Sequence, residues 1–106
     1  MPDARFTIPR LQRLLAQIPA DKVTTYADLA AAMGSPQAHR AAGNLLNKNP
    51  DPDTYPCFRV VKSDGSIGGF ATGQAEKIRR LHAAGIATEK GKIVDFSRRR
   101  FVFPKK

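Results

Sequence analysis

At residues 55–61 the chain reads YPCFRVV, and this stretch places the only cysteine, Cys57, between a proline and two β-branched residues. Pro56 has a fixed φ angle and disfavours helical backbone in the residue before it, so the chain is held as it enters the cysteine. Val60 and Val61 favour a strand. A thiol held at the start of a strand is a candidate nucleophile. The alternative is a lone cysteine that acts only as a small buried hydrophobic residue.

A turn and a glycine-rich loop follow this stretch. The Asp64-Gly65 pair predicts a two-residue hairpin turn that leads back along residues 66–67. Residues 68–73 read GGFATG. They do not form a phosphate-binding or dinucleotide-binding motif, because no lysine follows the last glycine and the spacing of strand, loop and helix differs. The loop therefore either lies against a flat ligand or acts as a flexible connector.

The length and composition predict a single domain, residues 1–106, with a flexible start at residues 1–6 and a basic tail at residues 91–106. No apolar run is long enough for a membrane-spanning helix, and no signal peptide is expected. One cysteine forms no intramolecular disulfide, which predicts an intracellular protein. The two histidines, His39 and His82, are isolated, so neither a structural metal nor another cofactor is expected.

Charge gives the first indication of a partner. The chain has 18 basic and 9 acidic residues, a net charge of +9. So large an excess in a short chain is typical of proteins that bind polyanions, which makes nucleic acid the first expected partner. A solvated basic surface and a ribosomal-type protein are the alternatives, because charge alone does not separate them.

Apolar residues at helical spacing predict four helices. The second opens with Thr25 and Asp28, whose spacing is that of a capping box, and Gly34 closes it. On the fourth, Lys77 is expected to face outward and Leu81 to face the core. The predicted helices cover residues 8–18, 26–33, 36–48 and 74–84. Their predicted N-caps are Thr7, Thr25, Ser35 and Thr72.

The remaining segments predict short β structure. Residues 22–24 favour a strand, and residues 91–103 alternate like a hairpin about Ser97 and three arginines. The fold class is therefore mainly α with small β hairpins. The second and third helices are joined by a short Gly-Ser turn, which predicts a helix-turn-helix arrangement.

The third helix carries small side chains around one arginine, Arg40. Ala41 and Gly43 lie in this part, so the helix can approach the backbone of a partner closely. The alternative is a tight contact with another helix of the same chain, since alanine is also the best helix former.

Several spaced motifs together resemble the O6-alkylguanine-DNA alkyltransferase family. The resemblance runs from Ile8 to Gly85 and concerns the DNA-binding and catalytic domain of that family, which implies a winged-helix-like fold. In this chain the motifs read IPxxKVxxY at residues 18–26, RAxG at 40–43, NP at 49–50, PCxRVV at 56–61 and GxxGGF at 65–70.

The resemblance implies a way of binding DNA. In the family, a helix-turn-helix enters the minor groove and an arginine takes the place of an extruded base in the stack; Arg40 matches that arginine. Ala41 and Gly43 stand on the recognition helix. Tyr26 matches the tyrosine that presses on the phosphate beside the flipped nucleotide, and Asn49 matches an asparagine hinge. A flat guanidinium partly replaces the stacking that extrusion of the base loses.

The resemblance also implies an alkylguanine pocket. Cys57 matches the cysteine that takes the alkyl group, and its carbonyl and that of Val60 match those that accept hydrogen bonds from the guanine amino group. Arg59 belongs to the same motif, and Phe70 stands where the family has a pocket-wall tyrosine. Transfer of the alkyl carbon to sulfur needs a thiolate and a donor for the departing guanine, a role that fits the Tyr26 hydroxyl.

The chain departs from the family pattern at two positions. Phe58 replaces the histidine that draws off the thiol proton, and Ala84 replaces the glutamate that orients this histidine. A single-turnover transferase acting on double-stranded DNA that contains O6-alkylguanine, as a monomer, is the favoured hypothesis. The first alternative is an alkyltransferase-like damage sensor, a type that typically has tryptophan at the position of Cys57. The second is a helix-turn-helix regulator with a structural cysteine.

Overall fold

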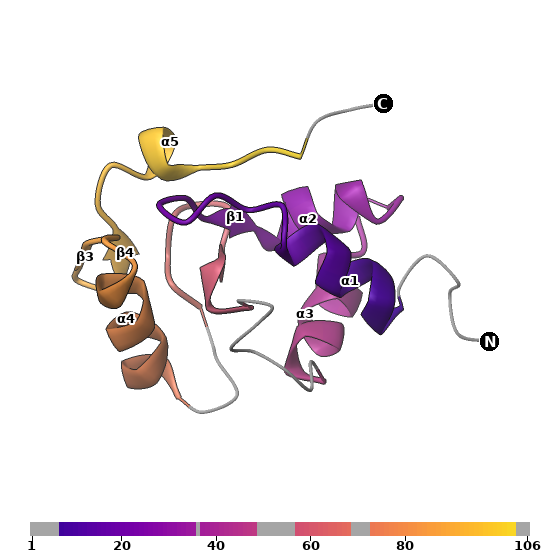
Figure 1. The fold of residues 1–106 in the computed structure, drawn as a ribbon, viewed down its shortest axis with the longest axis horizontal. Helices are drawn as coiled ribbons and strands as arrows, with labels where there is room; N and C mark the ends of the chain where they lie inside the picture. The colour runs from indigo at the N-terminus through magenta and orange to yellow at the C-terminus, as the bar shows by residue number, and fades with distance from the viewer. Residues whose placement is uncertain (1–6, 36, 49–56, 69–72, 104–106) are drawn as a thin grey trace.

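A computed structural model describes residues 7–35, 37–48, 57–68 and 73–103. The helices α1 (Ile8–Leu15), α2 (Tyr26–Ala32) and α3 (His39–Asn47) lie together on one side of the molecule, and α4 (Gln74–Ala83) lies on the other (Figure 1). The short helix α5 (Phe96–Arg99) precedes the segment that crosses back towards the three N-terminal helices. None of the described helices is long and apolar enough to cross a membrane.

The first helix begins where the sequence predicts and ends earlier. The Thr7 side chain accepts a hydrogen bond from the amide of Arg10, which confirms the predicted cap. The helix ends at Leu15 rather than at Ile18, and the amides of Gln17 and Ile18 donate to carbonyls three residues back instead of four. Ile18 precedes Pro19, and a residue before proline disfavours helical backbone. The predicted C-terminal end is therefore wrong by one turn.

The predicted helix-turn-helix is confirmed, although its second helix starts later than expected. The Thr25 side chain accepts from the Asp28 amide at 2.9 Å, and Gly34 has the positive φ angle that ends α2. Ser35 is not the N-cap of α3. Its amide donates to the carbonyl of Ala30 and so completes the end of α2. The chain then turns once more before α3 begins at His39, with Ala38 at the capping position.

Two pairs of short strands connect the helical parts. The strand β1 (Thr24–Thr25) runs parallel to β2 (Val60–Val61), and β3 (Thr88–Glu89) runs antiparallel to β4 (Lys92–Ile93). The predicted strand at Val60 and Val61 is therefore confirmed, but its partner is β1. Both valines are fully buried, which is typical of a strand covered on two faces.

The turn predicted at Asp64 and Gly65 exists, but no hairpin ladder extends from it. The Gly65 amide donates to the Lys62 carbonyl, and the Lys62 amide donates to the Ser66 carbonyl at 2.8 Å. Ser66 then pairs with Lys92 of β4 instead of continuing along β2. The hairpin prediction is wrong beyond the turn, because the chain after the turn bonds to the segment around β4, where the Ile67 amide donates to the Gly91 carbonyl.

The hairpin predicted for residues 91–103 is also wrong. Asp95 adopts a left-handed conformation at the start of α5, and the chain beyond this helix pairs with Val23. The Val23 amide donates to the Arg99 carbonyl, and the Phe101 amide donates to the Val23 carbonyl. The C-terminal segment thus adds to the β1 side of the fold, where residues 22–24 were predicted to form a strand.

Two hydrophobic clusters meet at β2. Val60 belongs to the cluster formed with α1, α2 and α3, whereas Val61 belongs to the cluster formed with α4 and the β3–β4 pair. Successive side chains of a strand point to opposite faces, so two neighbouring valines can enter two different cores. The stretch that begins at Cys57 therefore lies at the boundary between the two halves of the domain.

Candidate nucleic-acid interface

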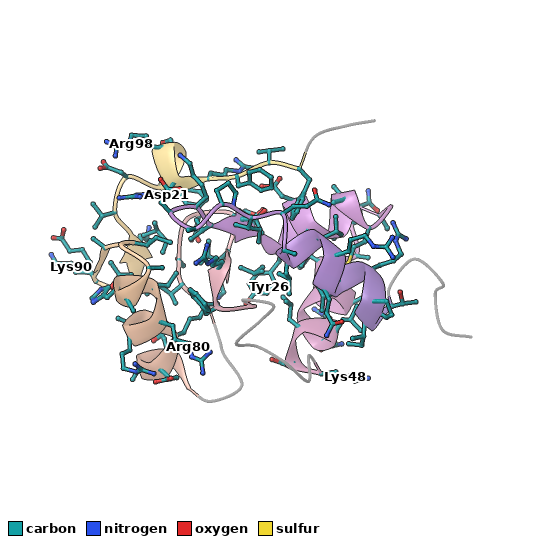
Figure 2. All side chains as sticks on the ribbon, in the orientation of Figure 1. Asp21, Tyr26, Lys48, Arg80, Lys90 and Arg98 are labelled. Carbon is teal, nitrogen blue, oxygen red and sulfur yellow. The ribbon has the colours of Figure 1, made fainter. Side chains whose placement is uncertain are left out.

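Tyr26 lies at this boundary, near the centre of the molecule (Figure 2). It is the first residue of α2 and directly follows β1, so its position is set by both the capping of Thr25 and the pairing of β1 with β2. A Cβ atom built on Gly43 would lie 3.8 Å from the Tyr26 ring, and one built on Gly68 would lie 3.3 Å from its hydroxyl. The ring thus packs between α3 and the chain that leads to the glycine-rich loop.

Lys77 is the site residue that the sequence reasoning missed. Its side chain was expected to face outward, but Lys77 is fully buried in α4. Its Nζ donates to the carbonyl oxygen of Val60 at 2.6 Å and lies 3.5 Å from the Tyr26 hydroxyl. The ammonium also lies 5.6 Å from the centre of the Tyr26 ring, within the range of a cation–π contact.

The reason for the burial of Lys77 is its place on the helix. Lys77 precedes the buried Leu81 by four residues, and residues four apart lie on the same helical face. A buried ammonium is tolerated only when its donors are used, and here Val60 and Tyr26 provide oxygen atoms. The spacing to Leu81 was the available signal in the sequence, and it was outweighed by the usual preference of lysine for water.

The residues after Cys57 form a single turn of 3₁₀-helix, Cys57–Arg59, before β2 begins. Arg59 donates to the Pro19 carbonyl at 2.7 Å, and its guanidinium carbon lies 5.1 Å from the centre of the Phe58 ring. Burial lowers the pKa of Arg59, and the nearby charge of Asp21 opposes this effect. In this geometry Arg59 fixes the turn that carries Cys57 against the turn after α1.

Phe58 and Ala84 both contribute to the hydrophobic cluster beside α4. Phe58 is 9% exposed, and Ala84, just after the end of α4, packs against the same cluster. These are the two positions at which the sequence departs from the expected histidine and glutamate. The local surroundings are therefore apolar and lack a proton acceptor at either of the two positions.

The outer surface of α3 carries small side chains next to Arg40. Arg40 and Ala41 are exposed, the next residue Ala42 is buried against the core, and Gly43 faces Tyr26. Arg40 therefore projects from the side of α3 that is open to a partner, and its neighbours are small. Lys48 lies just beyond the end of this helix (Figure 2).

The structure brings Tyr26, Gly43 and the Val60 carbonyl together and adds Lys77 to them. The predicted positions of Asn49 and Phe70 lie outside the described residues. Cys57 is the first residue of the 3₁₀ turn. The roles assigned to all of the predicted site residues, including Tyr26, Arg40 and Val60, remain predictions.

The model of the 6-O-methylguanine DNA methyltransferase DNA-binding domain matches residues 9–86. The chain belongs to this family. The resemblance and the fold class derived from the sequence are thereby confirmed. Family members include proteins named methylated-DNA–protein-cysteine methyltransferases, and the mouse protein of this name is 43% identical over 78% of this chain and 40% of its own length.

Two further proteins are similar to this chain, over very different shares of their own length. A bifunctional methyltransferase/endonuclease of Picrophilus torridus is 50% identical over 86% of this chain, but the match covers only 30% of that protein. The chain thus spans about a third of the length of these curated relatives. In contrast, S. pombe Atl1, solved with damaged DNA containing O6-carboxymethylguanine, matches 95% of this chain and 98% of its own, with a TM-score of 0.76 and 26% identity.

Proposed function

We propose that this protein repairs DNA by binding O6-alkylguanine in a double strand, flipping the lesion out of the stack and transferring the alkyl group to Cys57 once. The observation that carries the proposal is that the Tyr26 hydroxyl and the Val60 carbonyl both contact the same atom, Lys77 Nζ, and that Val60 directly follows the turn that begins at Cys57. A guanine base offers a donor amino group and acceptor ring nitrogens, so a hydroxyl and a carbonyl form a complementary pair.

The exposed face of α3 supports the DNA-binding part of the proposal. Arg40 projects from a helix with small neighbours, and the chain has a net charge of +9. Flipping a base costs a few kcal/mol of stacking and pairing, and this cost is least for a damaged base. A planar guanidinium inserted into the gap offsets part of that cost, because it can stack on the neighbouring bases.

The transfer step is a displacement at the alkyl carbon. The sulfur of the Cys57 thiolate forms a bond to this carbon, the bond from carbon to guanine O6 breaks, and its electron pair stays on the guanine. A proton from the Tyr26 hydroxyl neutralises the guanine as it leaves. The product is a thioether, which has no good leaving group, so the protein acts once.

Recognition of the lesion without transfer is the second candidate. The apolar residues Phe58 and Ala84 favour it, because they supply no base to deprotonate the thiol. The likeness to Atl1 along nearly the whole of both chains agrees with it. In this case repair would be completed by a further enzyme, and the joining of a similar domain to an endonuclease in Picrophilus torridus gives one chemical class for it.

The binding part is tested by fluorescence titration of two duplexes that differ only in one O6-methylguanine. We expect tighter binding to the lesion in every sequence context tried, because recognition depends on the flipped base. Equal affinity for both duplexes would contradict the proposed function. A preference that follows the flanking sequence, and not the lesion, would favour the helix-turn-helix regulator.

A further inference from the structure

The C-terminal segment, residues 99–103, holds the chain on both sides of Tyr26. Before Tyr26, the main chain of Arg100 forms a parallel bridge with Val23, so the segment runs alongside β1 (Figure 1). After Tyr26, the guanidinium of Arg100 donates two hydrogen bonds of 2.9 Å to the Asp28 carboxylate. One residue thus attaches the segment to the chain three residues before Tyr26 and two residues after it.

The segment supports β1 in addition to β2. The Val23 amide, directly before β1, donates to the Arg99 carbonyl at 2.8 Å. The Thr24 hydroxyl donates to the Phe101 carbonyl at 3.0 Å. A pair of short strands is at best marginally stable on its own, so these bonds help to fix β1. Because Tyr26 directly follows β1, they also help to fix Tyr26.

The segment is itself anchored in the hydrophobic core. The rings of Phe101 and Phe103 meet edge to face, with 5.1 Å between their centres. Phe103 is buried in the cluster formed with α1, α2 and α3, and Phe101 packs against the same cluster. Arg100 directly precedes Phe101, so the backbone that carries its guanidinium is held in place.

The loss of the Arg100 guanidinium would act on the first turn of α2. The side chain of Asp28 is only 15% exposed, and a shielded carboxylate is unfavourable without its partner. Asp28 lies two residues after Tyr26 on the same helix. A movement that brings this carboxylate to water therefore also moves Tyr26.

We propose that Arg100 is a positioning residue for lesion recognition, because its pair with Asp28 holds Tyr26 beside β2. This inference rests on the proposed function. The family model matches residues 9–86, so Arg100 lies beyond the part of the chain that the model describes. Arg100 does not touch the base; its effect is exerted through Asp28 and β1.

Two simpler roles for Arg100 lead to different results. If its guanidinium contacts a DNA phosphate, Arg100→Gln weakens binding to damaged and undamaged DNA equally. In that case Asp28→Asn releases the guanidinium and strengthens binding to both. If the pair only supports the fold, the lesion preference of the folded variants stays unchanged. The proposed role requires that the loss of either partner reduces the lesion preference.

The test compares Arg100→Gln, Asp28→Asn and the double variant. The measured quantity is the ratio of dissociation constants for a guanine duplex and for the same duplex with O6-methylguanine, at fixed salt and well below every melting temperature. We expect each single variant to reduce this ratio about threefold, and the double variant to lose no more than either one, since all three remove the same pair. Ile93→Val is the control, because it destabilises the buried core by a similar amount away from the segment and should keep the ratio.

An unchanged ratio in Arg100→Gln would overturn the inference. So would an Asp28→Asn variant that binds both duplexes more tightly with an unchanged ratio, because it would show a phosphate contact. A similar loss of the ratio in Ile93→Val would also overturn it, since lesion preference would then follow stability alone. A wild-type protein that binds both duplexes equally would instead contradict the proposed function itself, and the inference with it.

Discussion

Arg100 and Asp28 form an ion pair with two hydrogen bonds of 2.9 Å, although they are 72 residues apart in the chain. The pair joins the C-terminal segment to the first turn of α2, which begins with Tyr26. The Asp28 carboxylate, which a full capping box would direct to the Thr25 amide, bonds to this arginine. The segment after α5 therefore helps to hold the helix that positions the candidate site.

Arg100→Gln should lower the stability of the protein by about 0.5–1 kcal/mol, because the pair is bidentate but partly exposed to solvent. For a domain of this size the melting temperature should fall by a few degrees, about 4–8 °C for each kcal/mol. Differential scanning calorimetry measures the change. Asp28→Asn should produce a similar loss, and the double variant should lose little more than either single one. Additive losses would show that the pair is not coupled.

Arg40→Ala should weaken binding to the O6-methylguanine duplex more than Arg98→Ala does. Both arginines are exposed, so they form a matched pair for charge, but only Arg40 lies on α3. Arg99 is a poorer control, because its guanidinium donates to the Asp21 carbonyl. The measurement is a fluorescence titration at fixed salt. Equal losses for the two variants would contradict the assignment of Arg40 as the residue that fills the gap in the stack.

Much of the local structure could be predicted because it depends on neighbouring residues. The cap at Thr25 and the glycine at position 34 act within one turn of the chain, and both behave as expected. The start of α3 could not be predicted in this way, because Ser35 was equally suited to cap a new helix or to follow the end of the previous one. Its amide is used by α2, and this choice depends on how the two helices pack.

The predictions that failed involve partners far apart in the sequence. The strand β2 pairs with β1, and the segment around Phe101 pairs with Val23, so neither follows the local hairpin signal. Lys77 was expected in water because the oxygen atoms that satisfy its ammonium are supplied by Val60 and Tyr26, 17 and 51 residues away. The resemblance to the family identified Tyr26 and Val60 separately, and only the structure joins them through Lys77.

Glu76 should contribute to stability at neutral pH and lose this contribution in acid. Hydrogen bonds from Arg79 and then from Arg80 lower the pKa of its carboxyl from 4.5 to about 2. A pKa that is lower in the folded state stabilises the fold above pH 4.5 and ceases to do so as the pH falls towards 2. The difference in melting temperature between wild type and Glu76→Gln should therefore shrink across this range. A difference that stays constant would contradict the lowered pKa.

Phe58→His should not restore rapid transfer by itself. Position 58 is buried in the cluster beside α4, and Ala84 supplies no carboxylate to orient an imidazole. Burial of an unsatisfied polar ring should cost about 1–3 kcal/mol of stability. The double variant Phe58→His/Ala84→Glu should transfer faster than the single one in a single-turnover assay. Equal rates for the single and double variants would show that the two positions do not act together.

The most direct test of the proposed repair reaction is the intact mass of the protein after incubation with one equivalent of O6-methylguanine duplex under reducing conditions. We expect one added methyl group, about 14 Da, on wild-type protein, formed faster at higher pH because the thiolate is the nucleophile. Cys57→Ser should show no adduct and should keep its preference for the lesion. An unchanged wild-type mass, despite tight binding to the damaged duplex, would contradict transfer and leave a protein that recognises the lesion without repairing it.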